Sequence, residues 1–435
     1  MRTVRLLFTS VLFFSLLPLC VAGTAKPPGT IEDLPVAATW VQLAQPVATA
    51  DEFGYYYGTS VAISGDTMVV GQRYTVTGIG VAFVFVKPKA GNWNNLTQAA
   101  VLVPSDGLST DLFAASVAIS GDTIVVGSPP SAGCNTCGAG RAYVYVKPTG
   151  GWSGQLTQTA ELTASDGTIG SSVGSSVSIS SNTVAVGAPG EMPGAAYVFV
   201  EPANGWVNMT QTAKLTASDG VASDGFGTSV STSGSTIVAG APGANGSNTQ
   251  AGAAYVFTEP AGGWMNMTQT AKLIASDGAS FDQLGTAVGV SSNTVVAGAP
   301  IASGQVANAG AAYVYTEPAG GWSNATQTAK LTAPDGETGD TLGSAVAISG
   351  DTVVAGAPNR VCRLIRALGY PAGGAYVFTE SGSGWGQSTA QVLTGSDAHN
   401  ADILGASVAI SGRLVVTGAP YLGKYLGAAF VFVRF

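Results

Sequence analysis

Pairs of aspartates recur along the chain at one spacing, and they are the residues whose chemistry is most readily interpreted. Two carboxylates in one loop can close a turn by accepting backbone N–H bonds, or can bind calcium weakly if carbonyls complete its shell. The turn role is favoured, because calcium prefers about six to eight oxygens. No cofactor is expected to be required. The five pairs, of the form Asp-Gly-x-x-x-Asp with Ala398 replacing glycine in the last, are Asp106 and Asp111, Asp219 and Asp224, Asp277 and Asp282, Asp335 and Asp340, and Asp397 and Asp402.

Side chains suited to catalysis are few. His399 is the only histidine, which excludes a histidine metal triad, and neither a nucleophile elbow nor a phosphate-binding glycine loop follows a strand. We therefore expect a protein that is not an enzyme. The alternatives are a secreted carbohydrate-active enzyme that uses carboxylates alone, or a lectin that uses the acidic loops.

An arginine-rich insertion and a cysteine pair are the other notable polar features. Arg360, Arg363 and Arg366 lie in one short segment of a chain with only 10% charged residues. We predict a ligand contact there; a surface insertion with solvated arginines is the alternative. Cys134 and Cys137, in Cys-Asn-Thr-Cys, are expected to form a local disulfide rather than half of a zinc site. The role of Cys362 stays open.

These residues sit on a repeat that occurs seven times with a period of about 58 residues. Two clear copies are Phe226 to Pro242 and Leu342 to Pro358, each ending in Gly-Ala-Pro. Every copy but the last contains four strand-like runs, the first two joined by tight reversals such as Ser-Gly-Asp or Ser-Asn that suit positive φ. The period is typical of one blade per repeat, so we predict an all-β, seven-bladed β-propeller of four-stranded antiparallel blades.

The order of side-chain sizes places the strands within a blade. The first run is built of Ser, Ala, Val and Gly, whereas Tyr, Phe and Trp appear in the third and fourth, so the first should line the central axis. The last copy stops after its third run, and Trp40 precedes the first copy. We therefore expect the Trp40 region to supply the missing strand and to close the ring, which removes exposed sheet edges.

The Phe-Gly openings, Gly-Ala-Pro ends and Gly-Ala-Ala-Tyr-Val-Phe runs resemble FG-GAP repeats, the units of the seven-bladed head of integrin α subunits. The resemblance covers Trp40 to Phe435. It implies a binding or adhesion role with an extracellular protein or glycan as partner. The calcium loops of integrins shrink here to turns such as Ser411-Gly412-Arg413, so integrin-type calcium sites are expected to be absent.

The predicted strand directions sort the loops onto two faces. We call "top" the face that carries the fourth-to-first and second-to-third links, and "bottom" the face of the other hairpins. The aspartate pairs and the arginine insertion then lie on top. Sequons for glycosylation, effective only if the host glycosylates, are Asn95, Asn208, Asn266 and Asn324 near the bottom outer rim, and Asn245 on top.

The chain begins with a sequence typical of a secretory signal. Arg2 and Arg5 precede the apolar run Leu6 to Leu19, which is short for a membrane span. We expect a signal peptide at 1–22, a linker at 23–39 and a single propeller domain at 40–435, secreted and monomeric, although a retained anchor is the alternative to cleavage. The net charge of −8 disfavours nucleic acid as a partner.

Overall fold

The computed structural model describes residues 39–46, 54–75, 78–89, 93, 96–131, 133–134, 137–361, 372–396, 402–421 and 426–435. Within these ranges every regular element is a β-strand, and the strands form seven sheets. The predicted signal peptide at 1–22 and nearly all of the linker at 23–39 lie outside the described residues. In the part of the chain that the structure describes, no helix has the length and apolarity needed to cross a bilayer.

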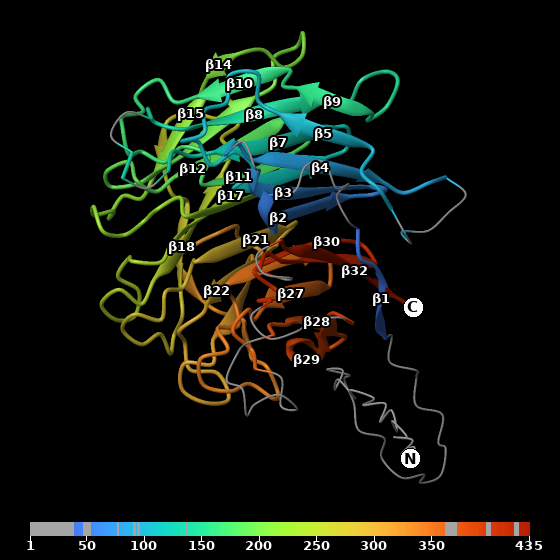
Figure 1. Cartoon of the computed structure of the whole chain (residues 1–435). Helices are drawn as coiled ribbons and strands as arrows, with labels where there is room; N and C mark the ends of the chain where they lie inside the picture. Colours follow the sequence, from blue (N-terminus) through green and yellow to red (C-terminus); the bar gives the residue numbers. More distant parts are fainter. Residues whose placement is uncertain are drawn as a thin grey trace, which may run out of the picture.

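Each sheet is one blade, and its innermost strand contacts the innermost strands of both neighbours (Figure 1). These contacts run from β2 round to β30 and back to β2, so the ring is closed. The seven-bladed propeller and the inner position of the first strand are thereby confirmed. The inner strands of blades 1 to 7 are β2 (Gly54–Ser64), β6 (Ser116–Ser120), β11 (Ser176–Ser180), β16 (Ser229–Ser233), β21 (Ala287–Ser291), β26 (Ala345–Ser349) and β30 (Ser407–Ser411).

Three further strands complete each blade in antiparallel order. The second strands are β3 (Thr67–Thr75), β7 (Thr123–Ser128), β12 (Thr183–Ala188), β17 (Thr236–Ala241), β22 (Thr294–Ala299), β27 (Thr352–Gly356) and β31 (Leu414–Ala419). The third are β4 (Val81–Val86), β8 (Arg141–Val146), β13 (Ala195–Val200), β18 (Ala253–Thr258), β23 (Ala311–Thr316), β28 (Ala375–Ser381) and β32 (Ala428–Arg434). The fourth are β5 (Ala100–Val103), β10 (Ala160–Thr163), β15 (Ala213–Thr216), β20 (Ala271–Ile274), β25 (Ala329–Leu331), β29 (Gly384–Leu393) and, in blade 7, β1 (Trp40–Ala44).

The two ends of the propeller close the ring as expected. Strand β1 pairs antiparallel with β32, with Trp40 opposite Arg434, and Figure 1 shows the two strands side by side. The Gln42 amide also exchanges two hydrogen bonds with Ser396, at 2.7 and 3.0 Å. The same exchange joins Gln158 to Ser105, Gln211 to Ser165, Gln269 to Ser218 and Gln327 to Ser276, so β1 occupies the position of a regular fourth strand.

A second ring of hydrogen bonds joins the hairpins between the first and second strands. The last serine of each inner strand accepts, at 3.1–3.3 Å, a backbone N–H from the hairpin of the next blade. The donating residue has φ between 51° and 57°, which confirms the expected positive φ. The donors are Gly65, Gly121, Ser181, Gly234, Ser292, Gly350 and Gly412.

The hydrophobic core consists of seven layers, each lying between two blades. Between blades 3 and 4, Val198 packs with Phe257 and Trp264. The seven tryptophans are all buried, with exposures of 1–7%. Burial of large side chains on the outer strands therefore fills the gaps that widen with distance from the axis.

Blades 1 to 4 differ from the predicted four-stranded form. Each carries a short fifth strand, donated by the following repeat and paired parallel to the fourth strand. The chain reaches the preceding blade just after the buried tryptophan and then returns to its own blade. These strands are β9 (Gly154–Thr157), β14 (Met209–Thr210), β19 (Met267–Thr268) and β24 (Ala325–Thr326).

The glycine of Gly-Ala-Pro lies against the backbone of the next blade. A Cβ added to Gly240 would lie 1.9 Å from the carbonyl oxygen of Gly285, and the equivalent at Gly298 would lie 1.9 Å from that of Gly343. Gly285 and Gly343 adopt φ near 90°, where a side chain is strained. Two glycines per interface are thus required by close approach and by backbone conformation.

We predict that Gly240→Ala lowers the free energy of unfolding by about 3 kcal/mol or more, because the methyl group must displace backbone rather than a side chain. Gly262→Ala is the control, since its Cβ would meet no atom within 4 Å. That change should stay within about 0.5 kcal/mol. Thermal and urea unfolding of both variants checks the expectation, and similar losses in the two would contradict it.

Candidate functional site

In the four pairs whose first aspartate the structure describes, that residue forms a tie between blades on the top face. Asp219 accepts hydrogen bonds from the Tyr255 hydroxyl at 3.0 Å and from Lys272 Nζ at 2.6 Å, both in the next blade. The ammonium also lies 5.4 Å from the centre of the Tyr255 ring. Equivalent ion pairs join Asp106 to Arg141, Asp166 to Lys214, Asp277 to Lys330 and Asp335 to Arg360.

These contacts favour the ionised form of Asp219 and of Asp335. Burial by itself would raise the pKa of Asp219, but hydrogen bonds from Lys272 and Tyr255 outweigh it and lower the pKa. The pKa of Asp335 is lowered in the same way by Tyr376 and Arg360. The carboxylates therefore already have a cationic partner from the protein itself, which lessens the charge they offer to a calcium ion.

In three of the pairs the second aspartate closes a turn. Asp224, Asp282 and Asp340 are buried, and each accepts the backbone N–H of the residue three positions before it, at 2.8–2.9 Å. Burial raises the pKa of Asp282 and Asp340. Asp111 and Asp402 are buried at the same position, and Asp397 lies outside the described residues.

One blade shows how this turn tolerates a substitution. Ser171 replaces the second aspartate and accepts the Thr168 N–H at 2.8 Å. Its hydroxyl donates to Glu191, a residue of the link between the second and third strands. The missing carboxylate is thus supplied from a neighbouring loop, and Glu191 also lies 3.4 Å from Lys214.

Arg360 has a structural position. Its guanidinium donates to Asp335 at 2.9 Å and to the Tyr376 hydroxyl at 2.8 Å, and its side chain is only 12% exposed. It takes the place that lysines occupy in blades 3 to 5, and the paired side chain has little surface to offer a ligand. Arg363, Arg366, Cys362 and His399 lie outside the described residues. Cys134 and Cys137 form a disulfide.

The sequon asparagines of three blades pair with the outer edge of the preceding blade. Asn266 Oδ1 accepts the backbone N–H of Lys214 at 2.7 Å, and Asn208 and Asn324 accept those of Glu161 and Lys272 at 2.8 and 2.7 Å. All three are exposed, as is Asn245 on top, while Asn95 lies outside the described residues. Their Oδ1 atoms therefore satisfy N–H groups of an edge strand that would otherwise face solvent.

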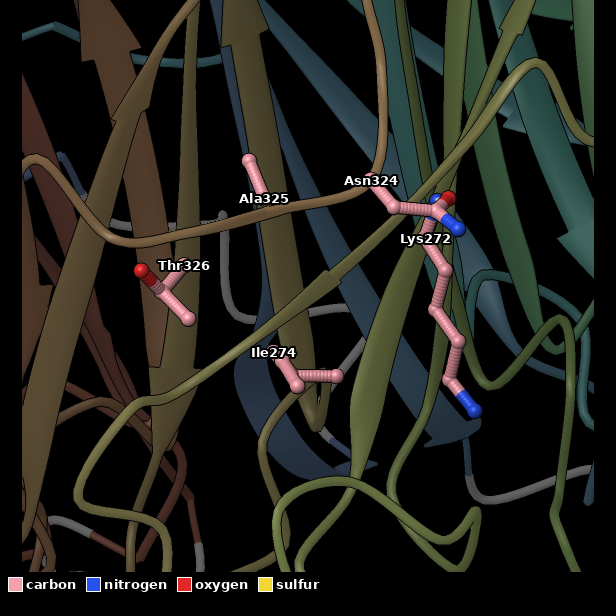
Figure 2. Close-up of a pocket in the computed structure, with 5 residues that line it drawn as sticks. All are labelled: Lys272, Ile274, Asn324, Ala325 and Thr326. Carbon is pink, nitrogen blue, oxygen red and sulfur yellow. The ribbon is translucent and has the colours of Figure 1, made fainter.

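Asn324 also borders a hollow of about 270 Å³ on the outside of blades 4 and 5. Figure 2 shows its amide against Lys272, with Ile274 and Thr326 on the other side of the hollow. The lining comes from β20 and from β24 with the residue before it. The hollow thus lies where the chain that leads to the outer strand of blade 5 first pairs, as β24, with β20 of blade 4.

A cluster of tyrosines lies on top, where blade 7 meets blade 1. The ring of Tyr56 packs edge-on against Tyr74 and Tyr421, with ring centres 5.9 and 5.2 Å apart, and Tyr55 adjoins it at 6.4 Å. Tyr55 is 53% exposed and Tyr421 is 37% exposed. We call these four residues the tyrosine patch.

The tyrosine patch was not predicted from the sequence. The sequence did contain a signal, because Tyr55 stands three residues before Gly58, which has a positive φ, and other blades have the buried aspartate at that position. Without that carboxylate the backbone continues as a strand, and β2 and β3 pair as far as Gly54 and Thr75. In place of the turn, the paired ends of β2 and β3 extend on the top face and carry aromatic side chains.

The fold defines a class of protein, the closed seven-bladed β-propeller. A model of the FG-GAP repeat matches seven stretches of the chain: residues 40–85, 96–145, 156–199, 209–257, 267–315, 325–378 and 385–432. The chain therefore belongs to the FG-GAP repeat family. No curated protein matches it. Each matched stretch from the second to the last begins on an outer segment and continues into the next blade, so the repeat and the blade are offset.

We predict different effects for a first aspartate and a second aspartate, taken from two pairs. Asp219→Asn should be destabilising at neutral pH, because the lowered pKa of Asp219 contributes stability above the unfolded value of about 3.9 that is lost as pH falls through the folded pKa. Asp340→Asn should not be destabilising, because it removes a buried charge yet can still accept the Glu337 N–H.

Melting temperatures of both variants and the unaltered protein, measured from pH 7 down to pH 2.5, test this pair. Both differences should shrink in acid, where the two carboxyls are protonated in the unaltered protein. A loss of stability in Asp340→Asn at pH 7 that equals the loss in Asp219→Asn would contradict the assignment.

A second prediction separates the structural role of a sequon from glycosylation. In a host that does not glycosylate, Asn266→Ala should destabilise the protein by about 0.5–1 kcal/mol through loss of the Lys214 hydrogen bond. Thr268→Ala, which breaks the same sequon but keeps the amide, is the control. Equal melting temperatures for the two variants would show that the amide contributes nothing.

Proposed function

We propose that the protein is a secreted, non-enzymatic binding propeller of the adhesion type, which recognises an extracellular protein or glycan through its top loops. The observation that carries this proposal is the tyrosine patch. Tyrosine combines a large apolar ring with a hydroxyl and loses little entropy when it is fixed, so exposed tyrosine clusters are typical of recognition surfaces.

The surroundings of the patch support a binding role. The described top-face carboxylates of the other blades are engaged in ion pairs or turns, whereas the patch presents rings that the fold does not bury. The φ of 68° at Tyr56 is similar to those of the equivalent residues Gln283 and Thr341, 62° and 60°, so the fold itself fixes the backbone that presents the ring.

Capture of extracellular proteins and glycans on the mature chain, residues 23–435, tests the proposal. The double variant Tyr55→Ser with Tyr421→Ser should weaken binding of the captured ligand by about tenfold or more. The control is Val207→Ser with Met265→Ser, exposed residues of the bottom links. Unchanged affinity in the tyrosine variant, or equal loss in the control, would contradict a ligand site at the tyrosine patch.

A further inference from the structure

A second site on the top face lies between blades 4 and 5. A hollow of about 310 Å³ opens there, lined by Pro242, Gly243, Gln250, Phe281, Gln283 and Thr286. The first three residues belong to the link between β17 and β18, and the others to the link that leads into β21. Its volume is at the lower end for small-molecule sites.

Phe281 is held beside this hollow in an unfavourable conformation. Its φ is 71° and its side chain is 58% exposed, so it gains neither backbone relaxation nor burial. The equivalent residue is Gly170 before blade 3 and Gly339 before blade 6, with φ of 91° and 88°. A bulky side chain thus occupies a position suited to glycine.

The backbone around Phe281 is well anchored. The Phe281 N–H donates to the Gln250 carbonyl at 3.1 Å, as the Gly339 N–H does to Asn308 at 2.9 Å. The N–H of Gln250 donates to Asn245 and that of Gly243 to the Asp224 carbonyl. The ring is therefore presented by a fixed scaffold whose N–H groups already have partners.

The polar groups that remain for a ligand are neutral. Among the described residues, the side-chain amides of Gln250 and Gln283 have no hydrogen-bond partner, and none of the six lining residues is charged. An amide both donates and accepts, which matches the hydroxyl groups of a sugar. An exposed ring matches the apolar C–H face of a sugar ring.

We propose that this hollow binds a neutral glycan, with one sugar ring against Phe281 and its hydroxyls on the amides of Gln250 and Gln283. The inference rests on the proposed binding function and specifies a ligand class and a site for it. A peptide fits less well, because the main-chain N–H groups named above are already engaged and offer no edge for strand pairing.

The test uses an array of immobilised neutral oligosaccharides, probed with the mature protein and three variants. Phe281→Gly installs the residue found at Gly170 and Gly339, and Gln283→Gly the residue found at Gly225, where φ is 64°. Both should weaken glycan binding about tenfold or more while the melting temperature stays equal or rises. Tyr55→Ser, in the separate tyrosine patch, should keep glycan binding.

The outcomes separate the inference from the proposed function. Glycan binding that survives Phe281→Gly overturns this site but leaves a binding propeller. Capture of a protein ligand with no binding to neutral glycans overturns the ligand class alone. Failure to bind either a glycan or a protein overturns both. A fall in melting temperature for Phe281→Gly would also count against the inference, because the residue would then be structural.

Discussion

The close approach of two backbones at each blade interface is the constraint on which the rest of the structure depends. With glycine at Gly240 and Gly285, neighbouring blades approach until a carbonyl oxygen occupies the space of a Cβ. At this distance between the blades, the serines of the inner strands can accept hydrogen bonds from the next hairpin, and the outer tryptophans fill the hydrophobic layers between blades. The glycines themselves contribute little energy; they permit the contacts that do.

The charged ties show that the fold requires a cation at a fixed place beside the aspartate, but not at a fixed position in the repeat. In blades 3 to 5 the cation beside the aspartate comes from the fourth strand, as with Lys272. In blade 2 it is Arg141 on the third strand, and in blade 6 it is Arg360 from a loop. Glu191 likewise replaces a carboxylate lost at Ser171. Such exchanges keep a partly buried aspartate paired while the sequence varies.

Periodic features could be predicted from the sequence, and features that join distant positions could not. The seven blades, the inner place of the small-residue strand and closure through Trp40 all follow from the repeat, and the structure confirms them. The fifth strands could not be predicted, because a strand as short as Met209–Thr210 leaves no periodic pattern in the sequence. The tyrosine patch could not be predicted either, because Tyr55 and Tyr421 come from opposite ends of the chain and join the same cluster only when the ring of blades closes.

The junctions between neighbouring blades are not all held by the same interactions. In blades 1 to 4 the fourth strand pairs in parallel with a short strand from the following repeat, which joins each of these blades to the next. The sheets of blades 5 to 7 have four strands among the described residues. At the last two junctions the tyrosine of the tie is replaced, by Phe430 in blade 7 and by Phe83 in blade 1. Local opening is therefore expected to begin at this seam, where the chain ends meet. A ligand that spans Tyr421 and Tyr55 would cross the seam, so that binding and closure would stabilise each other.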